Sequence, residues 1–225
     1  PAGIRFDGVS LDIEWLATDA PGGLQQFADF ITAFRAHLDA WPGKPGRLGM
    51  ATAMWFLWSD NPATPYMTAA TANKFDWLFL MCYNTFTNRV GSETQLFQHP
   101  SISGVEVVND RAVTQYTDNG VDPQRVVLGT SGEVLRQNVS AGAKYGDPAS
   151  GSTTGSGSGP RVNVIFDQAQ LDPISKSSFC IDGTTNYSFV TAASTLELVK
   201  LAQQHGLGGV GFYSTFASNS GTGAT

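Results

Sequence analysis

The amino-acid sequence predicts an α/β domain built on a parallel β-sheet, and three observations lead to this fold class. Segments with strand character alternate with segments of helical periodicity along most of the chain. Residues 77–83, Trp-Leu-Phe-Leu-Met-Cys-Tyr, are apolar without a break, as a parallel strand covered on both faces requires. The chain has 225 residues, 41% of them hydrophobic, which is enough for one domain with a sizeable core.

The pattern contains strands and helices in regular alternation. Strands are expected at residues 4–15, 47–55, 77–83, 125–130 and 208–213. Helices are expected at residues 24–38, 66–75, 105–116 and 195–205. Gly206 follows the last of these helices, at a position where a C-terminal cap favours glycine. Residues 147–159 are rich in Gly and Ser, which predicts a flexible surface loop within one domain.

The strand at residues 4–15 carries an unusual set of polar side chains. With a period of two, Ser10, Asp12 and Glu14 share one face, while apolar side chains occupy the other. Two carboxylates on one face of an apolar strand are costly to desolvate. Acid–base chemistry gives such a pair a purpose, because crowding and partial burial keep one carboxylic acid protonated near neutral pH. The alternative interpretation is a strand end with solvated acids.

Composition excludes several classes of partner. The net charge of −6 and the pI near 4.9 argue against nucleic acid and anionic membranes. No stretch approaches the roughly 20 apolar residues of a membrane span, and no Gly-rich phosphate loop follows a strand. The three His residues lack metal-ligand spacing, so we expect no metal and no cofactor.

The cysteines and the chain start leave alternatives open. Cys82 and Cys180 are compatible with one disulfide or with two free thiols. Because Pro1 is the first residue, the chain is expected to be processed or truncated, and a targeting segment could already be gone. Glycosylation sequons at Asn138 and Asn186 favour a secreted, extracellular protein.

Four motifs carry a family resemblance. Asp7, Gly8, Asp12 and Glu14 form Asp-Gly-x-x-x-Asp-x-Glu, which resembles the signature of glycoside hydrolase family eighteen, the chitinases and endo-β-N-acetylglucosaminidases. The sequence departs at Ser10, where most active members carry a further Asp. Three later stretches, residues 81–84, 125–129 and 194–213, look like the sixth strand, the seventh strand and the last helix and strand of that family.

The resemblance implies a TIM (β/α)8 barrel with the acidic motif on its fourth strand. Residues 1–225 then supply only about five βα units, the C-terminal five-eighths of one catalytic domain. An open piece of this kind leaves two sheet edges and half a core exposed. We therefore expect either a fragment of a longer polypeptide or a companion polypeptide that completes the barrel, and hypothesise the second, held non-covalently.

The resemblance also implies a substrate-assisted retaining mechanism. Glu14 would protonate the glycosidic oxygen, and the 2-acetamido oxygen of the substrate would attack the anomeric carbon to give an oxazolinium ion. Asp12 would orient the acetamido N–H, and Tyr83 would hydrogen-bond the acetamido oxygen. Tyr83 has the alternative of a buried structural aromatic.

Further side chains are expected to contact the sugar. Asn84, Tyr213, Trp58 and Ser10 are the candidates for substrate binding, although core packing is an equal alternative for Trp58. Tyr213 stands near the position where chitinases often place a tryptophan beneath the sugar.

The predicted activity is hydrolysis of β-1,4 linkages of N-acetylglucosamine, in chitin or in the chitobiose core of an N-glycan. Tyr213 and Asn84 favour the endo-β-N-acetylglucosaminidase type by a small margin. The competing hypothesis is a family-eighteen-like lectin or inhibitor without turnover, which Ser10 and the missing strands favour and which intact Asp12, Glu14 and Tyr83 oppose.

Overall fold

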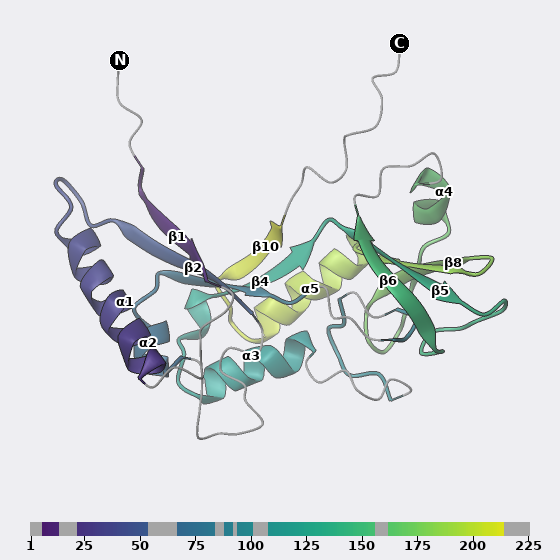
Figure 1. Cartoon of the computed structure of the whole chain (residues 1–225), viewed down its shortest axis with the longest axis horizontal. Helices are drawn as coiled ribbons and strands as arrows, with labels where there is room; N and C mark the ends of the chain where they lie inside the picture. Colours follow the sequence, from purple (N-terminus) through teal and green to yellow (C-terminus); the bar gives the residue numbers. More distant parts are fainter. Residues whose placement is uncertain are drawn as a thin grey trace, which may run out of the picture.

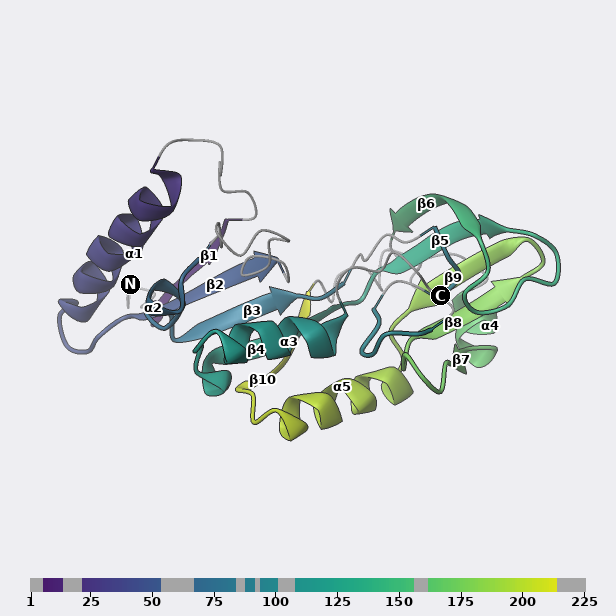
Figure 2. The same ribbon diagram turned by 90° about the horizontal axis from the view of Figure 1, so that it is seen from below.

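The computed structural model describes residues 6–13, 22–53, 67–83, 88–91, 94–100, 108–155 and 162–213. These residues form two five-stranded β-sheets and the helices that pack against them. The two sheets lie at opposite ends of the molecule (Figures 1 and 2).

The first sheet is entirely parallel, which confirms the α/β fold class. Its order is β1-β2-β3-β4-β10, and each strand pairs in parallel with its neighbours. The strands span Gly8–Asp12 (β1), Arg47–Ala53 (β2), Trp77–Met81 (β3), Val126–Ser131 (β4) and Gly209–Tyr213 (β10). Among the described residues this sheet is open, with β1 and β10 at its edges, so a closed TIM barrel is not what the structure contains.

Helices between these strands cover one face of the parallel sheet. They span Gly23–Asp39 (α1), Ala69–Ala72 (α2), Asn109–Asp118 (α3) and Ala192–Gln204 (α5), with a short 3₁₀ turn at Pro123–Arg125 before β4. In Figure 1, α2 and α3 lie below the strands. Fully buried Leu48, Leu78 and Leu80 point to this side and share one core with Tyr116 of α3 and Leu201 of α5. Burial of this apolar layer is the main stabilising term for the sheet.

Capping side chains decide where the helices begin. Thr68 accepts a hydrogen bond from the Thr71 N–H, so α2 starts at Ala69 and is only four residues long, shorter than the expected 66–75. Thr191 and Ser194 form a reciprocal capping box, which starts α5 three residues before the expected position 195. Gly206 has a φ of 66°, which confirms the predicted glycine cap.

A second, antiparallel sheet is inserted between β4 and α5, and the sequence analysis did not predict it. Its order is β6-β5-β9-β8-β7. The strands span Val134–Val139 (β5), Ala149–Gly155 (β6), Gln170–Leu171 (β7), Ser178–Asp182 (β8) and Thr185–Phe189 (β9), and helix α4 spans Val162–Asp167.

Strand β6 corrects the prediction of a loop at residues 147–159. Residues 149–155 form this strand, although residues 156–159 lie outside the described part of the chain. The partner strand β5 supplies the backbone hydrogen bonds, from Val134 opposite Gly155 to Val139 opposite Ala149. Because an antiparallel edge strand is held by its backbone, small polar side chains suffice where the sequence offers no apolar run.

Polar side chains are buried inside this second sheet. The Asn186 side-chain amide on β9 donates to the Gln137 side-chain oxygen on β5 at 2.8 Å, and both residues are buried. This hydrogen bond satisfies the Asn186 amide N–H and the Gln137 oxygen in place of water.

Both cysteines are buried and free, which settles the open alternative in favour of two thiols. Cys82 directly follows β3, while Cys180 lies within β8 rather than in a loop. Burial raises the pKa of both thiols, so they remain protonated and unreactive near neutral pH. Among the described helices, none is both long enough and apolar enough to cross a membrane.

Candidate functional site

The face of the parallel sheet that no described helix covers, called the open face below, carries the candidate site. Alternation along the strands sends one set of side chains to the helices and the other set to this open face. Asp12 is the last residue of β1 and is exposed, and it pairs across β2 through Ala51 to Phe79 of β3. Ser10 is also exposed, two residues earlier on the same strand. The predicted sharing of one face by Ser10 and Asp12 therefore agrees with the strand pairing.

Two tyrosines meet at the carboxyl ends of β3 and β10. The rings of Tyr83 and Tyr213 are stacked, with centroids 5.6 Å apart and planes 10° from parallel. Tyr83 is buried, with 9% of its surface exposed, whereas Tyr213 is 51% exposed. The structure thus brings together two of the predicted site residues that are 130 positions apart in the sequence.

Several predicted site residues lie outside the described part of the chain. These are the proposed proton donor Glu14 and the predicted sugar-binding residues Asn84 and Trp58. Their roles stay predictions. Asp7, which belongs to the acidic motif, directly precedes β1, at the end of the strand opposite to Asp12. Its side chain pairs with Lys44, and its carbonyl accepts a hydrogen bond from the Arg47 N–H at 2.9 Å. This arrangement gives Asp7 a structural role in joining β1 to β2.

Phe79 is a residue of the open face that the sequence analysis did not single out. Its ring lies 6.5 Å from that of Tyr83, at an interplanar angle of 58°. Phe79 was read as part of a uniformly apolar strand. The signal that identifies it is its spacing of four residues from Tyr83, which places both side chains on one face.

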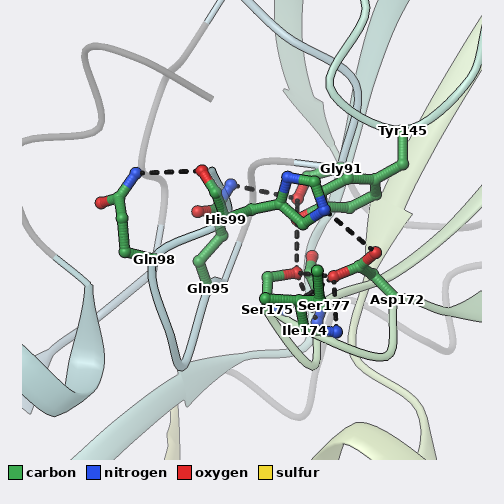
Figure 3. Close-up of polar contacts among 9 residues, drawn as sticks. All are labelled: Gly91, Gln95, Gln98, His99, Tyr145, Asp172, Ile174, Ser175 and Ser177. Atoms are coloured by element: carbon green, nitrogen blue, oxygen red, sulfur yellow. Dashed lines mark hydrogen bonds and ion pairs between the residues drawn. The ribbon is translucent and has the colours of Figure 1, made fainter. Parts of the chain in front are cut away.

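A buried polar cluster joins the segment that follows Tyr83 to the inserted sheet (Figure 3). Asp172 accepts hydrogen bonds from the Ser175 N–H at 2.6 Å and from the Ser175 hydroxyl at 2.8 Å, and its other oxygen lies 3.7 Å from His99 Nε2. The Ser175 carbonyl in turn accepts from the Leu96 N–H at 2.9 Å. Residues 94–100 therefore rest on the turn between β7 and β8.

Tyr145 completes this cluster from the β5–β6 loop. Its hydroxyl lies 2.9 Å from the Gly91 carbonyl and within hydrogen-bond distance of Ser175 Oγ, and its ring packs against His99 at 4.9 Å. A Cβ atom on Gly91 would come within 2.0 Å of that ring, so glycine is required there. Burial raises the pKa of Tyr145, and the Asp172 charge adds to this, so the phenol stays neutral.

The serine, histidine and aspartate of this cluster are not arranged for nucleophilic catalysis. Ser175 is fully buried, and its hydroxyl donates to Asp172 rather than to His99. A nucleophilic serine needs a base at its own oxygen and access to substrate. The cluster is therefore a structural joint. Within the described ranges, no group of three or more His, Cys, Asp or Glu residues is placed to hold a metal ion.

Successive parallel βα units, with an acidic and two phenolic side chains near the carboxyl ends of their strands, define the class of this protein as parallel α/β. The family model for glycosyl hydrolases family 18 matches residues 2–217. The chain therefore belongs to glycosyl hydrolase family 18, a TIM-barrel family, and the resemblance seen in the sequence is confirmed.

Solved structures of the same family have a similar fold. A family 18 N-acetylglucosaminidase from Paenibacillus barengoltzii is 17% identical with a TM-score of 0.79, over 95% of this chain and 67% of that one. A chitinase from Cycas revoluta, solved with (GlcNAc)3, is 20% identical with a TM-score of 0.76, over 94% and 64%. A chitinase-like agglutinin from Robinia pseudoacacia is 21% identical with a TM-score of 0.77, over 96% and 65%.

The chain spans about two thirds of the length of these three structures. Among curated proteins, no relative is found. The comparisons give no support to a companion polypeptide, which stays a prediction.

Proposed function

We propose that this chain carries the catalytic residues of a retaining glycoside hydrolase that cleaves β-1,4 linkages of N-acetylglucosamine. The observation that carries the proposal is that Asp12 ends β1 on the face of the parallel sheet where the stacked rings of Tyr83 and Tyr213 lie at the carboxyl ends of β3 and β10. In barrel-type enzymes this edge of the sheet is where substrates bind and react.

The proposed reaction uses the substrate as its own nucleophile. Glu14 protonates the glycosidic oxygen while the acetamido oxygen attacks the anomeric carbon, so the leaving group departs with the proton and an oxazolinium ion forms. Asp12 accepts a hydrogen bond from the acetamido N–H, which orients the nucleophile and stabilises the cation. Tyr83 donates to the acetamido oxygen. Glu14 then acts as the base for the water that opens the ring.

Exposure distinguishes the tyrosines' proposed roles. Tyr213 is half exposed and offers one ring face to a sugar, while its other face is taken up by Tyr83. A tyrosine offers less stacking area than tryptophan, which supports an N-glycan substrate over a long chitin chain. Asn84, Trp58 and Ser10 are proposed to complete the sugar contacts.

A glycan-binding protein without turnover is the second candidate function. The observation that favours it is Ser10, which is exposed on the open face two residues before Asp12 and replaces the carboxylate of most active members. The structural likeness to a chitinase-like agglutinin is compatible with this reading. Serine at position 10 places a neutral hydroxyl beside Asp12 in place of a second carboxylate.

Turnover on two substrates separates these candidates. The chain is assayed with a fluorogenic chitobiose glycoside and with a high-mannose glycopeptide, and Glu14→Gln serves as the control. Release from either substrate that Glu14→Gln abolishes supports the hydrolase. Sugar binding by calorimetry without release from either substrate rejects the hydrolase and favours the lectin.

A secreted location is also proposed. Asn138 of the first sequon is exposed on β5, which supports it. Detection of a glycan on Asn138 in the native protein tests this location.

A further inference from the structure

We infer that Phe79 is a positioning residue that fixes the ring of Tyr83 as part of a three-ring bridge across the open face of the parallel sheet. The bridge consists of Phe79 and Tyr83 from β3 and its end, and of Tyr213 from β10. It spans β4, which lies between these two strands. The inference rests on the proposed function, in which the Tyr83 hydroxyl contacts the substrate.

Two glycines create the room that the Phe79 ring occupies. Gly129 on β4 and Gly211 on β10 pair with each other in the sheet. A Cβ atom at Gly129 would come within 2.6 Å of the Phe79 ring, and one at Gly211 within 2.7 Å. Neither glycine has the positive φ that would require it for backbone reasons. At Gly211 the Phe79 ring is the closest obstacle to a side chain, whereas at Gly129 the ring and the Leu80 carbonyl oxygen, 2.5 Å from the same Cβ position, exclude one together.

Tyr83 lies just beyond the end of β3, next to two aromatic rings. Strand β3 ends at Met81, and the Cys82 N–H turns back to donate to the Leu80 carbonyl at 2.8 Å. Among the described residues, the strand pairings of β3 end at Met81, two residues before Tyr83. The ring is instead flanked by Phe79, tilted by 58°, and by Tyr213, stacked at 5.6 Å. Aromatic pairs at these separations are attractive beyond their simple area of contact.

The bridge sets the direction in which the Tyr83 hydroxyl points. A ring held between two others keeps one orientation, so its hydroxyl meets the acetamido oxygen without a search through rotamers. Phe79 itself offers no polar atom to the substrate. Its effect on turnover therefore passes through Tyr83 and falls on kcat rather than on KM.

Two variants disturb the bridge, and one matched variant leaves it intact. Phe79→Leu removes the ring while keeping an apolar side chain, and Gly211→Ala pushes a Cβ atom into the ring from β10. Trp77→Leu is the control, because Trp77 is an equally half-buried aromatic on the same face of β3 that packs over Gly49 rather than near Tyr83.

Steady-state kinetics on the fluorogenic chitobiose glycoside, corrected for the folded fraction, is the first measurement. We expect Phe79→Leu and Gly211→Ala to lower kcat about 10- to 100-fold with little change in KM, and Trp77→Leu to keep the wild-type kcat. In a Tyr83→Phe background, Phe79→Leu should have no further effect, because no hydroxyl is left to position. If Phe79→Leu lowered kcat by the same factor in the wild-type and Tyr83→Phe backgrounds, the inference would be overturned.

A measurement without turnover separates this inference from the proposed function. 3-Fluorotyrosine placed at position 83 should show a ¹⁹F resonance displaced by the neighbouring rings, and Phe79→Leu and Gly211→Ala should move it toward the free value. Trp77→Leu should not. These shifts in a chain without turnover would reject the hydrolase and leave the bridge standing. A ¹⁹F chemical shift that is unchanged in Phe79→Leu would reject the bridge.

Discussion

The two sheets of this chain are held together by different forces. In the parallel sheet, one row of side chains is apolar and fully buried, including Leu48, Leu80 and Leu128. In the antiparallel sheet, buried positions include Gln137, Asn186 and Ser188, and side-chain hydrogen bonds join neighbouring strands. Burial of apolar surface therefore dominates the first, whereas the second combines small apolar clusters around Tyr187 and Phe179 with directional polar contacts.

The parallel sheet carries the proposed site, and the antiparallel sheet holds a neighbouring segment in place. The parallel sheet has one covered face and one open face, and the open face carries the proposed site. The antiparallel sheet uses its polar turn, Asp172–Ser175–Ser177, to hold residues 94–100, which follow Tyr83 in the chain (Figure 3). Substitutions in the parallel sheet should therefore lower activity on the open face and stability on the covered face. Substitutions in the antiparallel sheet should destabilise only the residues around them.

Replacement of Asp12 should produce the largest effect and act on activity alone. Asp12→Asn is expected to lower kcat by about 100-fold or more, because the neutral amide stabilises the cationic intermediate poorly. As Asp12 is exposed, its free energy of unfolding should change by less than about 0.5 kcal/mol. Enzyme kinetics and urea unfolding check both parts, with exposed Asp118→Asn on α3 as control. Unchanged kcat would remove Asp12 from the site.

Truncation in the apolar layer should cost the most stability. Leu80→Ala removes a fully buried side chain from the centre of the parallel sheet. We expect a loss of about 2–5 kcal/mol in the free energy of unfolding, from lost burial and from the cavity left behind. Urea denaturation measures it. A loss below about 1 kcal/mol would mean that this layer is not the packed core that its burial indicates.

Removing the charge of Asp172 should destabilise the joint between the two regions. Asp172→Asn weakens its hydrogen bonds with Ser175 and its 3.7 Å contact with His99 Nε2. We expect a cost of about 2 kcal/mol and faster hydrogen exchange at the Leu96 amide, which donates to the Ser175 carbonyl. Amides of β2 and β3 should keep their protection. Uniform loss across both sheets would show that they unfold as one unit.

Raising the pH to about 10 should have the smallest effect and should act on both regions. Burial raises the pKa of Tyr116, against the parallel sheet, and of Tyr145, in the polar cluster, above the ordinary value of 10.0. The unfolded chain therefore loses these protons first, so the part of the stability that depends on the two phenols is constant well below pH 10 and falls as the pH approaches and passes 10. Each phenol should cost about 0.4 kcal/mol at the ordinary pKa, and increasingly more above it.

Single substitutions show how much of the alkaline decrease in the free energy of unfolding comes from each tyrosine. Tyr116→Phe and Tyr145→Phe should each remove a similar part of the pH dependence in unfolding experiments between pH 8 and about 11. A slope that neither substitution changes would assign the alkaline loss to other groups, such as the buried thiol of Cys82, whose pKa burial also raises.

The parallel sheet was predictable because its strands and helices carry strong local signals. The apolar run at residues 77–83 and the helical spacing at residues 24–38 both reflect one-sided or two-sided burial. The helix starts at Ala69 and Ala192 were missed because a cap is a contact between side chain and backbone, which a hydrophobic pattern does not encode.

The inserted sheet could not be read in the same way. Strand β6, Ala-Ser-Gly-Ser-Thr-Thr-Gly, has the composition of a loop, and only its pairing with β5 makes it a strand. At the site, the meeting of Tyr83 with Tyr213 followed from strand ends that share an edge. The part played by Phe79 depends on two glycines from other strands, Gly129 and Gly211, so it needed three-dimensional pairing.

The hydrogen bond between Asn186 and Gln137 has a consequence for how the protein is best made. An oligosaccharide attached to an asparagine requires that side chain to stand in solvent. Asn186 lies on β9, is fully buried and faces Gln137 of the neighbouring strand β5, so a sugar added there before folding would keep these two strands apart. A production host that lacks N-linked glycosylation therefore protects the antiparallel sheet, while Asn138, which is exposed, tolerates either host.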